Sequence, residues 1–318
     1  MGNRCGPGWP TRRYRRGVPD KPSAEFEIHE DLVRALLASQ ATGIPGAATL
    51  PLAHAADGWD CSVWRLGDDL AVRLPRRALA APLVLHEQEV LSEIAGRLAT
   101  TGVGVPAPVV EGRPGSGYPW SWSVVPWFDG RSGLGVPRPD RTGWAAPLGA
   151  ALLALHVEAP PRFPVNPVRG VPLARRERAV AGRFTSLRGR VPDAALTPLR
   201  QLWDAALGAP AWSGSPLCIH GDLHPGNLVA RGSDLVAIID FGDVTAGDPA
   251  YDLAVAWLAF DPVGRATFRT AVGERYGTAT WTRAHGWAAA VTLMLLDQSD
   301  DNPAYLALGT EALAELTS

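Results

Sequence analysis

Lysine is nearly missing from this chain of 318 residues, because Lys21 is the only one among 30 basic residues. A positive charge needed inside the fold must therefore come from arginine, whose guanidinium stays protonated and presents a planar fork of donors. Cysteine is also scarce. Only Cys5, Cys61 and Cys218 occur, which excludes a disulfide-rich scaffold and favours a reduced, cytoplasmic setting.

Long apolar runs are lacking as well. No stretch approaches the roughly 18 uninterrupted apolar residues of a membrane-spanning helix, and no apolar segment follows the basic N-terminus as in a secretory signal, so we expect no membrane partner. The net charge is −2, but residues 1–23 hold six basic residues and one acid, which leaves −7 on the remainder. An acidic body disfavours a nucleic-acid partner and suits a cationic small molecule.

The chain divides into three parts by composition. Residues 1–23 are rich in Gly, Pro and Arg without periodicity, so we expect a disordered basic tail. Their composition also makes Val18 a candidate for the native start, read from a GUG codon. Residues 24–128 predict a small β-rich lobe, and residues 129–318 predict a larger helical lobe. The expected fold class is therefore bilobal α+β, with a ligand site between the lobes.

Hydrophobic periodicity and turn residues place the individual elements. A hairpin is expected at Gly67–Asp69. The expected strands are Ser62–Leu66, Leu70–Leu74, Ala107–Glu111, Tyr118–Val125, Leu217–His220, Asn227–Ala230 and Leu235–Asp240. The expected helices are 29–40, Pro82–Leu98, Thr142–His156, Leu173–Leu187, Leu196–Leu207, Pro249–Phe260, Thr280–Leu296 and Pro303–Leu316.

Two carboxylates and an amide are spaced along HGDLHPGN at 220–227 and IIDFGD at 238–243. Asn227 and Asp240 bracket the predicted hairpin, whose geometry brings its open ends together. Their oxygens suit Mg²⁺, which takes few protein ligands and completes its shell with phosphates and water. Asp222 then remains to accept a proton from an attacking hydroxyl, which is the pattern of phosphoryl transfer. Taken singly, Asp222 and Asn227 would be ordinary turn residues.

These two segments, followed by GDPAYDLA at 247–254, resemble the aminoglycoside-phosphotransferase family from about residue 25 to the C-terminus. The resemblance implies a protein-kinase-like fold and a small-molecule kinase. Such an enzyme moves the γ-phosphate of ATP or GTP, with Mg²⁺, to a hydroxyl of an aminoglycoside-like antibiotic or related molecule. It also implies that Asp222 is the catalytic base, that Asn227 and Asp240 bind the metal, and that His220 holds the catalytic loop.

In kinase-like folds a strand cation paired with a helix glutamate grips the phosphates. Strand alternation points Arg73 to the cleft, in place of the usual lysine. Glu87 is the matching acid, because it falls on the apolar stripe of the helix Pro82–Leu98, and an acid there needs a partner.

The rest of the predicted nucleotide site is less distinctive. The first hairpin loop has a single glycine, and its Ser62 is a candidate phosphate contact. By resemblance alone, adenine meets the backbone near Ser123–Trp127, including Val125 and Trp127.

Other interpretations stay open. The acceptor is alternatively choline, a sugar, a macrolide, an amino alcohol or a protein side chain. His220, Asp222 and His224 could ligate a metal in a metallohydrolase, although that leaves Asn227 and Asp240 without a role. A non-catalytic nucleotide-binding module is a third reading. Three acids at Asp297, Asp300 and Asp301 form either an ammonium-binding patch or a solvated helix end.

Overall fold

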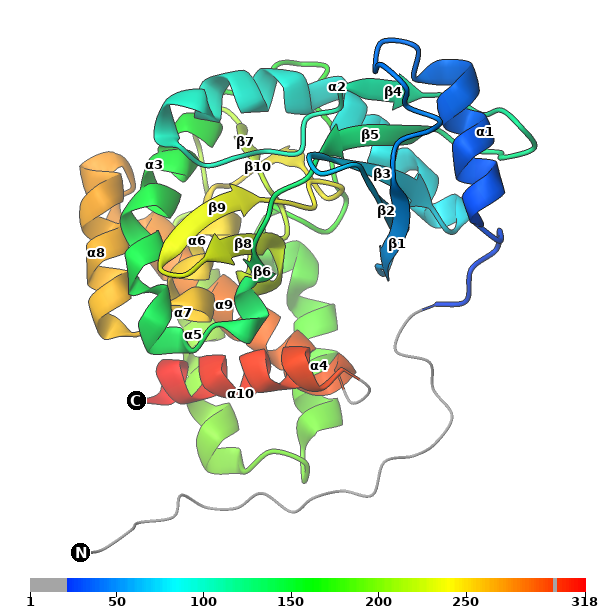
Figure 1. The fold of residues 1–318 in the computed structure, drawn as a ribbon. Coiled ribbons are helices and arrows are strands. Elements are labelled where there is room, and N and C mark those ends of the chain that lie inside the picture. The colour runs from blue at the N-terminus through cyan, green and yellow to red at the C-terminus, as the bar shows by residue number, and fades with distance from the viewer. Residues whose placement is uncertain (1–21, 300–301) are drawn as a thin grey trace, which may run out of the picture.

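A computed structural model of the chain describes residues 22–299 and 302–318. A sheet-rich body at one end of the molecule is joined to a larger, mostly helical body, so the predicted bilobal α+β fold is confirmed (Figure 1). The predicted tail lies almost entirely outside the described residues, as do Asp300 and Asp301. Within those residues no helix is both long and apolar enough to cross a membrane.

The first body is built on a five-stranded antiparallel sheet with the order β1-β2-β3-β5-β4. Alternation in β3 sends Val72 and Leu74 to one face, where they pack under the apolar stripe of α1. The same alternation sends Arg73 to the opposite face, toward α2. The elements are α1 (Glu30–Gln40), β1 (Leu52–Asp57), β2 (Cys61–Leu66), β3 (Leu70–Pro75), α2 (Ala81–Leu98), β4 (Val110–Gly112) and β5 (Trp122–Pro126).

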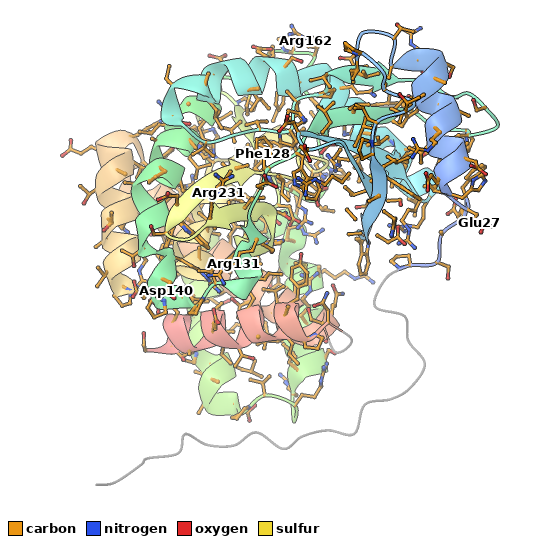
Figure 2. The ribbon with its side chains drawn as sticks, viewed as in Figure 1. Glu27, Phe128, Arg131, Asp140, Arg162 and Arg231 are labelled. Atoms are coloured by element: carbon orange, nitrogen blue, oxygen red, sulfur yellow. The ribbon has the colours of Figure 1, made fainter. Side chains whose placement is uncertain are left out.

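Helix α2 connects the two bodies. Its buried residues Val90, Leu91, Ile94 and Leu98 belong to the core of the helical body rather than to the core under α1. The chain after α2 then pairs with the second body, because Gly104 N–H donates to Val236 O at 2.8 Å. The ring of Phe128 covers Gly104 so closely that a Cβ there would overlap it. Phe128 is labelled in Figure 2.

The helical body follows most of the predicted helices with shifted boundaries. Helix α3 begins at Ala145 instead of Thr142, which puts Pro147 in the first turn, where its missing N–H breaks no helical bond. The predicted helix Pro249–Phe260 is two short helices that break at Ala254. The elements are α3 (Ala145–Leu155), α4 (Glu177–Leu187), α5 (Asp193–Gly208), α6 (Ala250–Leu253), α7 (Val255–Ala259), α8 (Pro262–Val272), α9 (Thr278–Gln298) and α10 (Pro303–Thr317).

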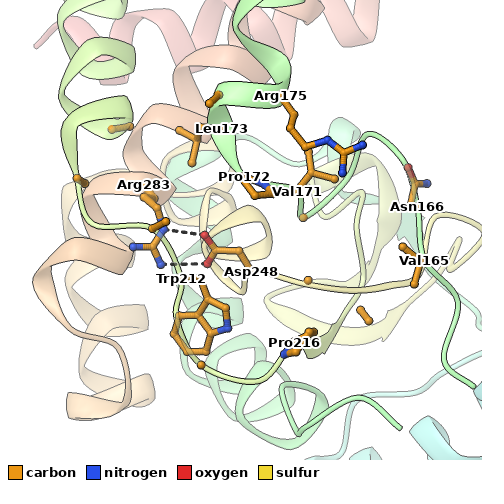
Figure 3. A pocket seen from close by; sticks show the side chains of 18 of the residues that line it. Val165, Asn166, Val171, Pro172, Leu173, Arg175, Trp212, Pro216, Asp248 and Arg283 are labelled. Atoms are coloured by element: carbon orange, nitrogen blue, oxygen red, sulfur yellow. Dashed lines mark hydrogen bonds and ion pairs between the residues drawn. The ribbon is translucent and has the colours of Figure 1, made fainter. Parts of the chain in front are cut away.

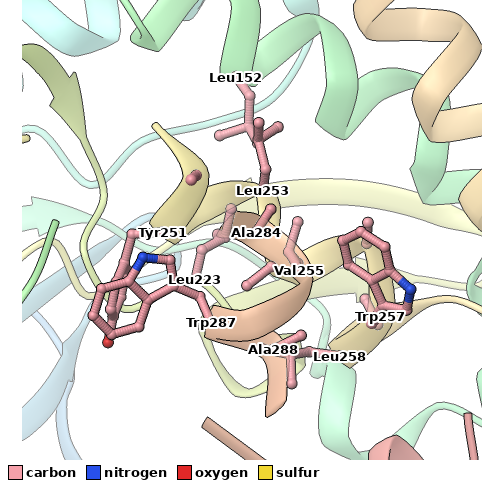
Figure 4. Packing of buried hydrophobic residues seen from close by; sticks show 14 of the residues in the cluster. Leu152, Leu223, Tyr251, Leu253, Val255, Trp257, Leu258, Ala284, Trp287 and Ala288 are labelled. Atoms are coloured by element: carbon pink, nitrogen blue, oxygen red, sulfur yellow. The ribbon is translucent and has the colours of Figure 1, made fainter. Parts of the chain in front are cut away.

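Helix α8 was not predicted, although the sequence carries its start signal. Asp261 caps it by accepting from Gly264 N–H at 2.8 Å, and Pro262 occupies the first turn. The core beneath is aromatic: Tyr251 lies edge-on to Trp287 with ring centroids 4.8 Å apart (Figure 4). All four residues of α6, including Asp252, are buried in this packing.

Small sheets carry the loops of the site. In the sheet β6-β8-β9, the last two strands form the predicted hairpin, which turns at Gly232 with φ of 60°. Strand β10 pairs with β7, a pairing that the sequence did not indicate. Asn227 lies in a 3-10 turn just before β8 rather than in the strand. The strands are β6 (Arg131–Ser132), β7 (Leu217–Ile219), β8 (Leu228–Arg231), β9 (Asp234–Ile238) and β10 (Thr245–Gly247).

Candidate active site

The loop after β7, which carries Asp222, is anchored by Asp252 of α6. Its carboxylate, which is fully buried, accepts from the backbone N–H of His220 at 2.7 Å and of Gly221 at 2.9 Å. His156 lies 3.1 Å from the same carboxylate. Gly221 has φ of 83°, and a Cβ there would overlap Asp243 O. The loop conformation therefore requires glycine at 221 and an acceptor at 252.

Both ring nitrogens of His220 are occupied within the loop. Nδ1 lies 3.1 Å from Asp222 N–H, which can only donate, and Nε2 lies 3.0 Å from Ile239 O, which can only accept. The ring is therefore neutral with its proton on Nε2, and neither nitrogen is left for a metal. In His224, Nδ1 likewise accepts from Gly226 N–H. The described residues hold no cluster of three His, Cys, Asp or Glu side chains suited to a metal, so nothing favours the metallohydrolase reading.

The Asp222 carboxylate lies between two nitrogen groups. Arg169 Nη2 is 3.1 Å from Oδ1, and His224 Nε2 is 3.5 Å from Oδ2. Burial raises the pKa of Asp222, but the Arg169 charge and the His224 contact together outweigh it, and the pKa of Asp222 falls well below its usual range. The group is therefore ionised at neutral pH while its side chain keeps 27% exposure to accept a proton.

Arg169 is the residue that sequence analysis missed. Its guanidinium also lies 3.0 Å from the Asp243 carboxylate and donates to Tyr251 Oη at 2.6 Å. Asn166 Nδ2 donates to the other oxygen of Asp243 at 2.7 Å. Arg169 lies on an irregular segment before α4, with no periodicity to give its direction. No pattern in the sequence distinguishes it from the other arginines.

The two predicted metal ligands lie at the open end of the β8–β9 hairpin. Ile239 N–H donates to Asn227 O at 2.9 Å, which brings residue 240 beside Asn227. The Asn227 amide donates through Nδ2 to Asp222 O at 2.8 Å, so its Oδ1 faces away from that bond. Asp240 has φ of 63°, uncommon outside glycine, and its side chain is 56% exposed. An amide oxygen and an exposed carboxylate fit a Mg²⁺ site completed by phosphate oxygens.

The expected ion pair between Arg73 and Glu87 is present. Arg73 Nη1 lies 2.8 Å from Oε1 and 2.7 Å from Oε2 of Glu87. Phe241 N–H also donates to Oε1 at 3.1 Å, and Arg73 Nη2 is 3.9 Å from Asp240 Oδ1. Glu87 therefore ties β3 to the segment that carries Asp240, a connection across the two bodies that the sequence did not show.

The other residues predicted to contact the nucleotide are buried or already hydrogen-bonded within the protein. Ser62 is 2% exposed, and its hydroxyl accepts from Trp64 Nε1 at 3.1 Å. Val125 is buried in β5, and the backbone N–H of Trp127 already donates to Asp69 O at 2.7 Å. Contacts of these three residues with nucleotide stay a prediction. Trp122, just before Ser123, is fully buried in the core under α1.

A cavity of about 570 Å³ lies beside the segment that carries Asn166 and Arg169, and Asn166 is one of its lining residues (Figure 3). Its wall includes Trp212 and the buried ion pair of Asp248 with Arg283, whose atoms are 2.6 Å apart. The residues that line it do not include Asp222, Asn227 or Asp240. The three predicted site residues therefore lie outside this cavity.

A kinase-like fold that brings together the carboxylate of Asp222, the amide of Asn227, the carboxylate of Asp240 and an arginine paired to a helix glutamate is typical of a phosphotransferase of the protein-kinase-like class. The profile described as the phosphotransferase enzyme family, APH, matches residues 52–287, and the chain belongs to this family. The protein is thus an enzyme that phosphorylates an alcohol group of a small molecule. A search of the curated proteins finds no sequence match.

Solved structures share the fold at low sequence identity. The GDP complex of wild-type aminoglycoside 2'-phosphotransferase-IIIa has a TM-score of 0.66 and 16% identity, over 91% of this chain and 99% of that one. The macrolide 2'-phosphotransferase MphH from Brachybacterium faecium, as apoenzyme, has 0.59 and 21%, over 89% and 97%. ADP-bound aminoglycoside phosphotransferase APH(2'')-Ib has 0.56 and 14%, over 92% and 97%.

Proposed function

We propose that this enzyme transfers the γ-phosphate of ATP or GTP to a hydroxyl of an antibiotic-like small molecule, with Asp222 as base and Mg²⁺ held by Asn227 and Asp240. The observation that carries the proposal is the Asp222 carboxylate, ionised and partly exposed on a loop anchored by Asp252. Residues 24–128 would supply the nucleotide site, and residues 129–318 the catalytic loop and acceptor site.

In this mechanism the acceptor hydroxyl hydrogen-bonds to Asp222, which orients its oxygen toward the phosphorus. As the new O–P bond forms and the bridging bond to the β-phosphate breaks, the proton passes to Asp222 and a nucleoside diphosphate leaves. Arg73, fixed by Glu87, would bind phosphate oxygens through its remaining donors. When bound, Mg²⁺ neutralises charge on the phosphates.

Two acceptor classes deserve testing first. Solved structures of similar fold include an aminoglycoside and a macrolide phosphotransferase, so both classes are suitable first acceptors. The net charge of −7 outside residues 1–23 favours a cationic aminoglycoside. Release of ADP or GDP in the presence of each acceptor distinguishes these classes and also the donor.

The test of the proposal is Asp222→Asn, with the exposed Asp234→Asn as the matched control. Turnover should fall by a factor on the order of 10²–10⁴ in the first variant, the usual contribution of a general base, while nucleotide affinity stays near that of the wild type. The control should keep its turnover. Near wild-type turnover in Asp222→Asn would remove Asp222 from the role.

A further inference from the structure

The cavity beside Asn166 is separate from the residues of the proposed reaction, since neither Arg73 nor Asp222 nor Asp240 lines it. Its volume of about 570 Å³ lies within the range of about 300–1,000 Å³ that is usual for small-molecule sites. Its walls come from the segment 165–175, from the end of α5 with the chain that follows it, and from β10 (Figure 3). The proposed reaction leaves this cavity without a role.

Contacts within the chain hold two of the walls in place. Asp248 N–H donates to Gly170 O at 2.9 Å, and a Cβ at Gly247 would lie only 2.7 Å from the same oxygen. The segment that carries Gly170 is therefore packed directly against β10. On another wall, Trp212 donates from Nε1 to Ser215 O at 3.0 Å, which fixes the direction of its ring.

Apolar side chains and glycines form most of the lining. The polar lining residues are Asn166, Arg175, Asp248 and Arg283. Asp248 and Arg283 pair through two contacts of 2.6 and 3.1 Å, and Arg283 Nη1 donates to Pro210 O at 2.6 Å. Asn166 donates from Nδ2 to Asp243 at 2.7 Å, and its Oδ1 accepts from two backbone N–H groups. Three of the four polar side chains are thus satisfied within the protein.

Arg175 is the fourth. Its guanidinium has no hydrogen bond or ion pair with any other residue in the described parts of the chain, and the residue is exposed. Its backbone N–H donates to Pro172 O at 3.0 Å, which fixes the base of the side chain. Figure 3 shows the guanidinium on the side of Asn166, away from Trp212. A molecule in the cavity would therefore meet an aromatic, apolar wall at one end and a free cation at the other.

We propose that this cavity binds a small aromatic acid, a molecule with an apolar ring system and one acidic oxygen group such as a carboxylate or sulfonate. Its rings would pack against Trp212 and the apolar walls, because burial of apolar surface and contacts between aromatic rings both stabilise a complex. Its acidic group would accept from Arg175, whose planar guanidinium can donate two parallel hydrogen bonds. The Asp248 carboxylate does not oppose this, since it is paired with Arg283.

Asn166 relates the cavity to the surroundings of Asp222. The Asp243 carboxylate that accepts from Asn166 also lies 3.0 Å from Arg169, and Arg169 lies 3.1 Å from Asp222 Oδ1. A bound acid would thus contact the same short segment that places a positive charge beside Asp222. The inference adds a second ligand to the protein and does not rest on the proposed reaction, because it concerns binding alone.

The test uses two dyes that share their aromatic rings and differ in one charge: 8-anilinonaphthalene-1-sulfonate and the neutral N-phenyl-1-naphthylamine. Their fluorescence rises when they leave water, so each is titrated against the full chain. Saturating Mg²⁺ and a non-hydrolysable triphosphate are present, which keeps the proposed nucleotide site filled. We expect saturable binding of one molecule of either dye per chain.

Added bulk locates the dyes. Ala211→Trp and Ala174→Trp each add a large side chain at an exposed position of the lining, and each should abolish most of the binding of both dyes. The control Ala194→Trp makes the same change at an exposed position of α5 that does not line the cavity, and it should affect neither dye. Binding that survives in both lining variants would place the dyes elsewhere and overturn the inference, as would the lack of saturable binding to the wild type.

Charge reversal tests the recognition of the acidic group. Arg175→Glu should weaken binding of the sulfonate by about tenfold or more, because it replaces a charged donor with a repelling carboxylate, and should leave binding of the neutral dye unchanged. The control Arg178→Glu, at an exposed position of α4 outside the lining, should change neither dye. If Arg175→Glu weakens both dyes equally, or weakens neither, the cavity does not select an acid and the inference is wrong.

Discussion

Removing Arg73 should destabilise the protein more than removing its partner Glu87. In the variant Arg73→Met the apolar stem is kept and the guanidinium is lost. Glu87, whose side chain is only 4% exposed, then retains the Phe241 N–H at 3.1 Å as its hydrogen bond. In Glu87→Gln, by contrast, Arg73 keeps 15% exposure to solvent and Asp240 at 3.9 Å. Arg73→Met therefore leaves a buried carboxylate without its cation, whereas Glu87→Gln leaves a guanidinium that still reaches solvent.

The magnitudes follow from this asymmetry. Breaking a buried ion pair by removing one partner costs about 3–5 kcal/mol, and we expect Arg73→Met to fall in this range at pH 8. Glu87→Gln should cost about 1–3 kcal/mol, because the remaining arginine is partly solvated and the amide can still accept from Phe241 N–H. The double variant should cost less than the two single losses added together.

The loss in Arg73→Met should also depend on pH. Burial raises the pKa of Glu87, and Arg73 only partly opposes this, so deleting Arg73 raises the pKa further. A carboxyl whose pKa is higher in the folded than in the unfolded protein binds a proton on folding, so stability rises as the pH falls through the folded pKa toward the unfolded one. The free energy lost in Arg73→Met should therefore be smaller near pH 5 than near pH 8.

Urea unfolding followed by tryptophan fluorescence, at several pH values from about 5 to 8, measures these differences. Glu89→Gln, an exposed glutamate on the same helix, is the control and should change stability little. A loss in Arg73→Met that does not vary with pH would show that Glu87 is not left as an unpaired buried acid. Strictly additive single losses would mean that the ion pair contributes nothing.

Three further predictions concern the proposed base, the proposed metal site and the half-buried His285. Arg169→Gln should raise the pKa of Asp222 and move the acid limb of the kcat–pH profile to higher pH, and Arg169→Lys should move it less. An acid limb that does not move in Arg169→Gln would refute the role of Arg169 in lowering the pKa of Asp222. Asp240→Ala should abolish Mg²⁺-dependent nucleotide binding, and Asn227→Ala should only weaken it, as measured by calorimetry with and without Mg²⁺. Unchanged Mg²⁺ dependence in Asp240→Ala would refute the proposed metal site. Burial lowers the pKa of His285 to about 4, whereas the unfolded chain accepts a proton there below about pH 6.5. Stability should therefore fall by up to about 3 kcal/mol between pH 6.5 and pH 4. Urea unfolding at several pH values should show that His285→Gln removes much of this pH dependence.

Much of the site could be predicted because its information is local. Asp222, Asn227 and Asp240 lie within one short segment, where a hairpin brings its own ends together whatever the rest of the chain does. The pair of Arg73 and Glu87 was predicted from two periodicities, since a strand alternates every two residues and a helix repeats every 3.6. Each of these patterns fixes the direction of a side chain before any tertiary contact forms.

Only the tertiary structure decided which groups surround Asp222. Arg169 and Asp243 are 74 residues apart and lie on irregular segments, so no period gives the direction of either side chain. The bond from Phe241 N–H to Glu87 spans 154 residues and both bodies. Such contacts depend on how α2 and α6 pack into the common core. Local sequence therefore determined which polar groups come together at the hairpin, and the packing of distant segments determined the charges around Asp222.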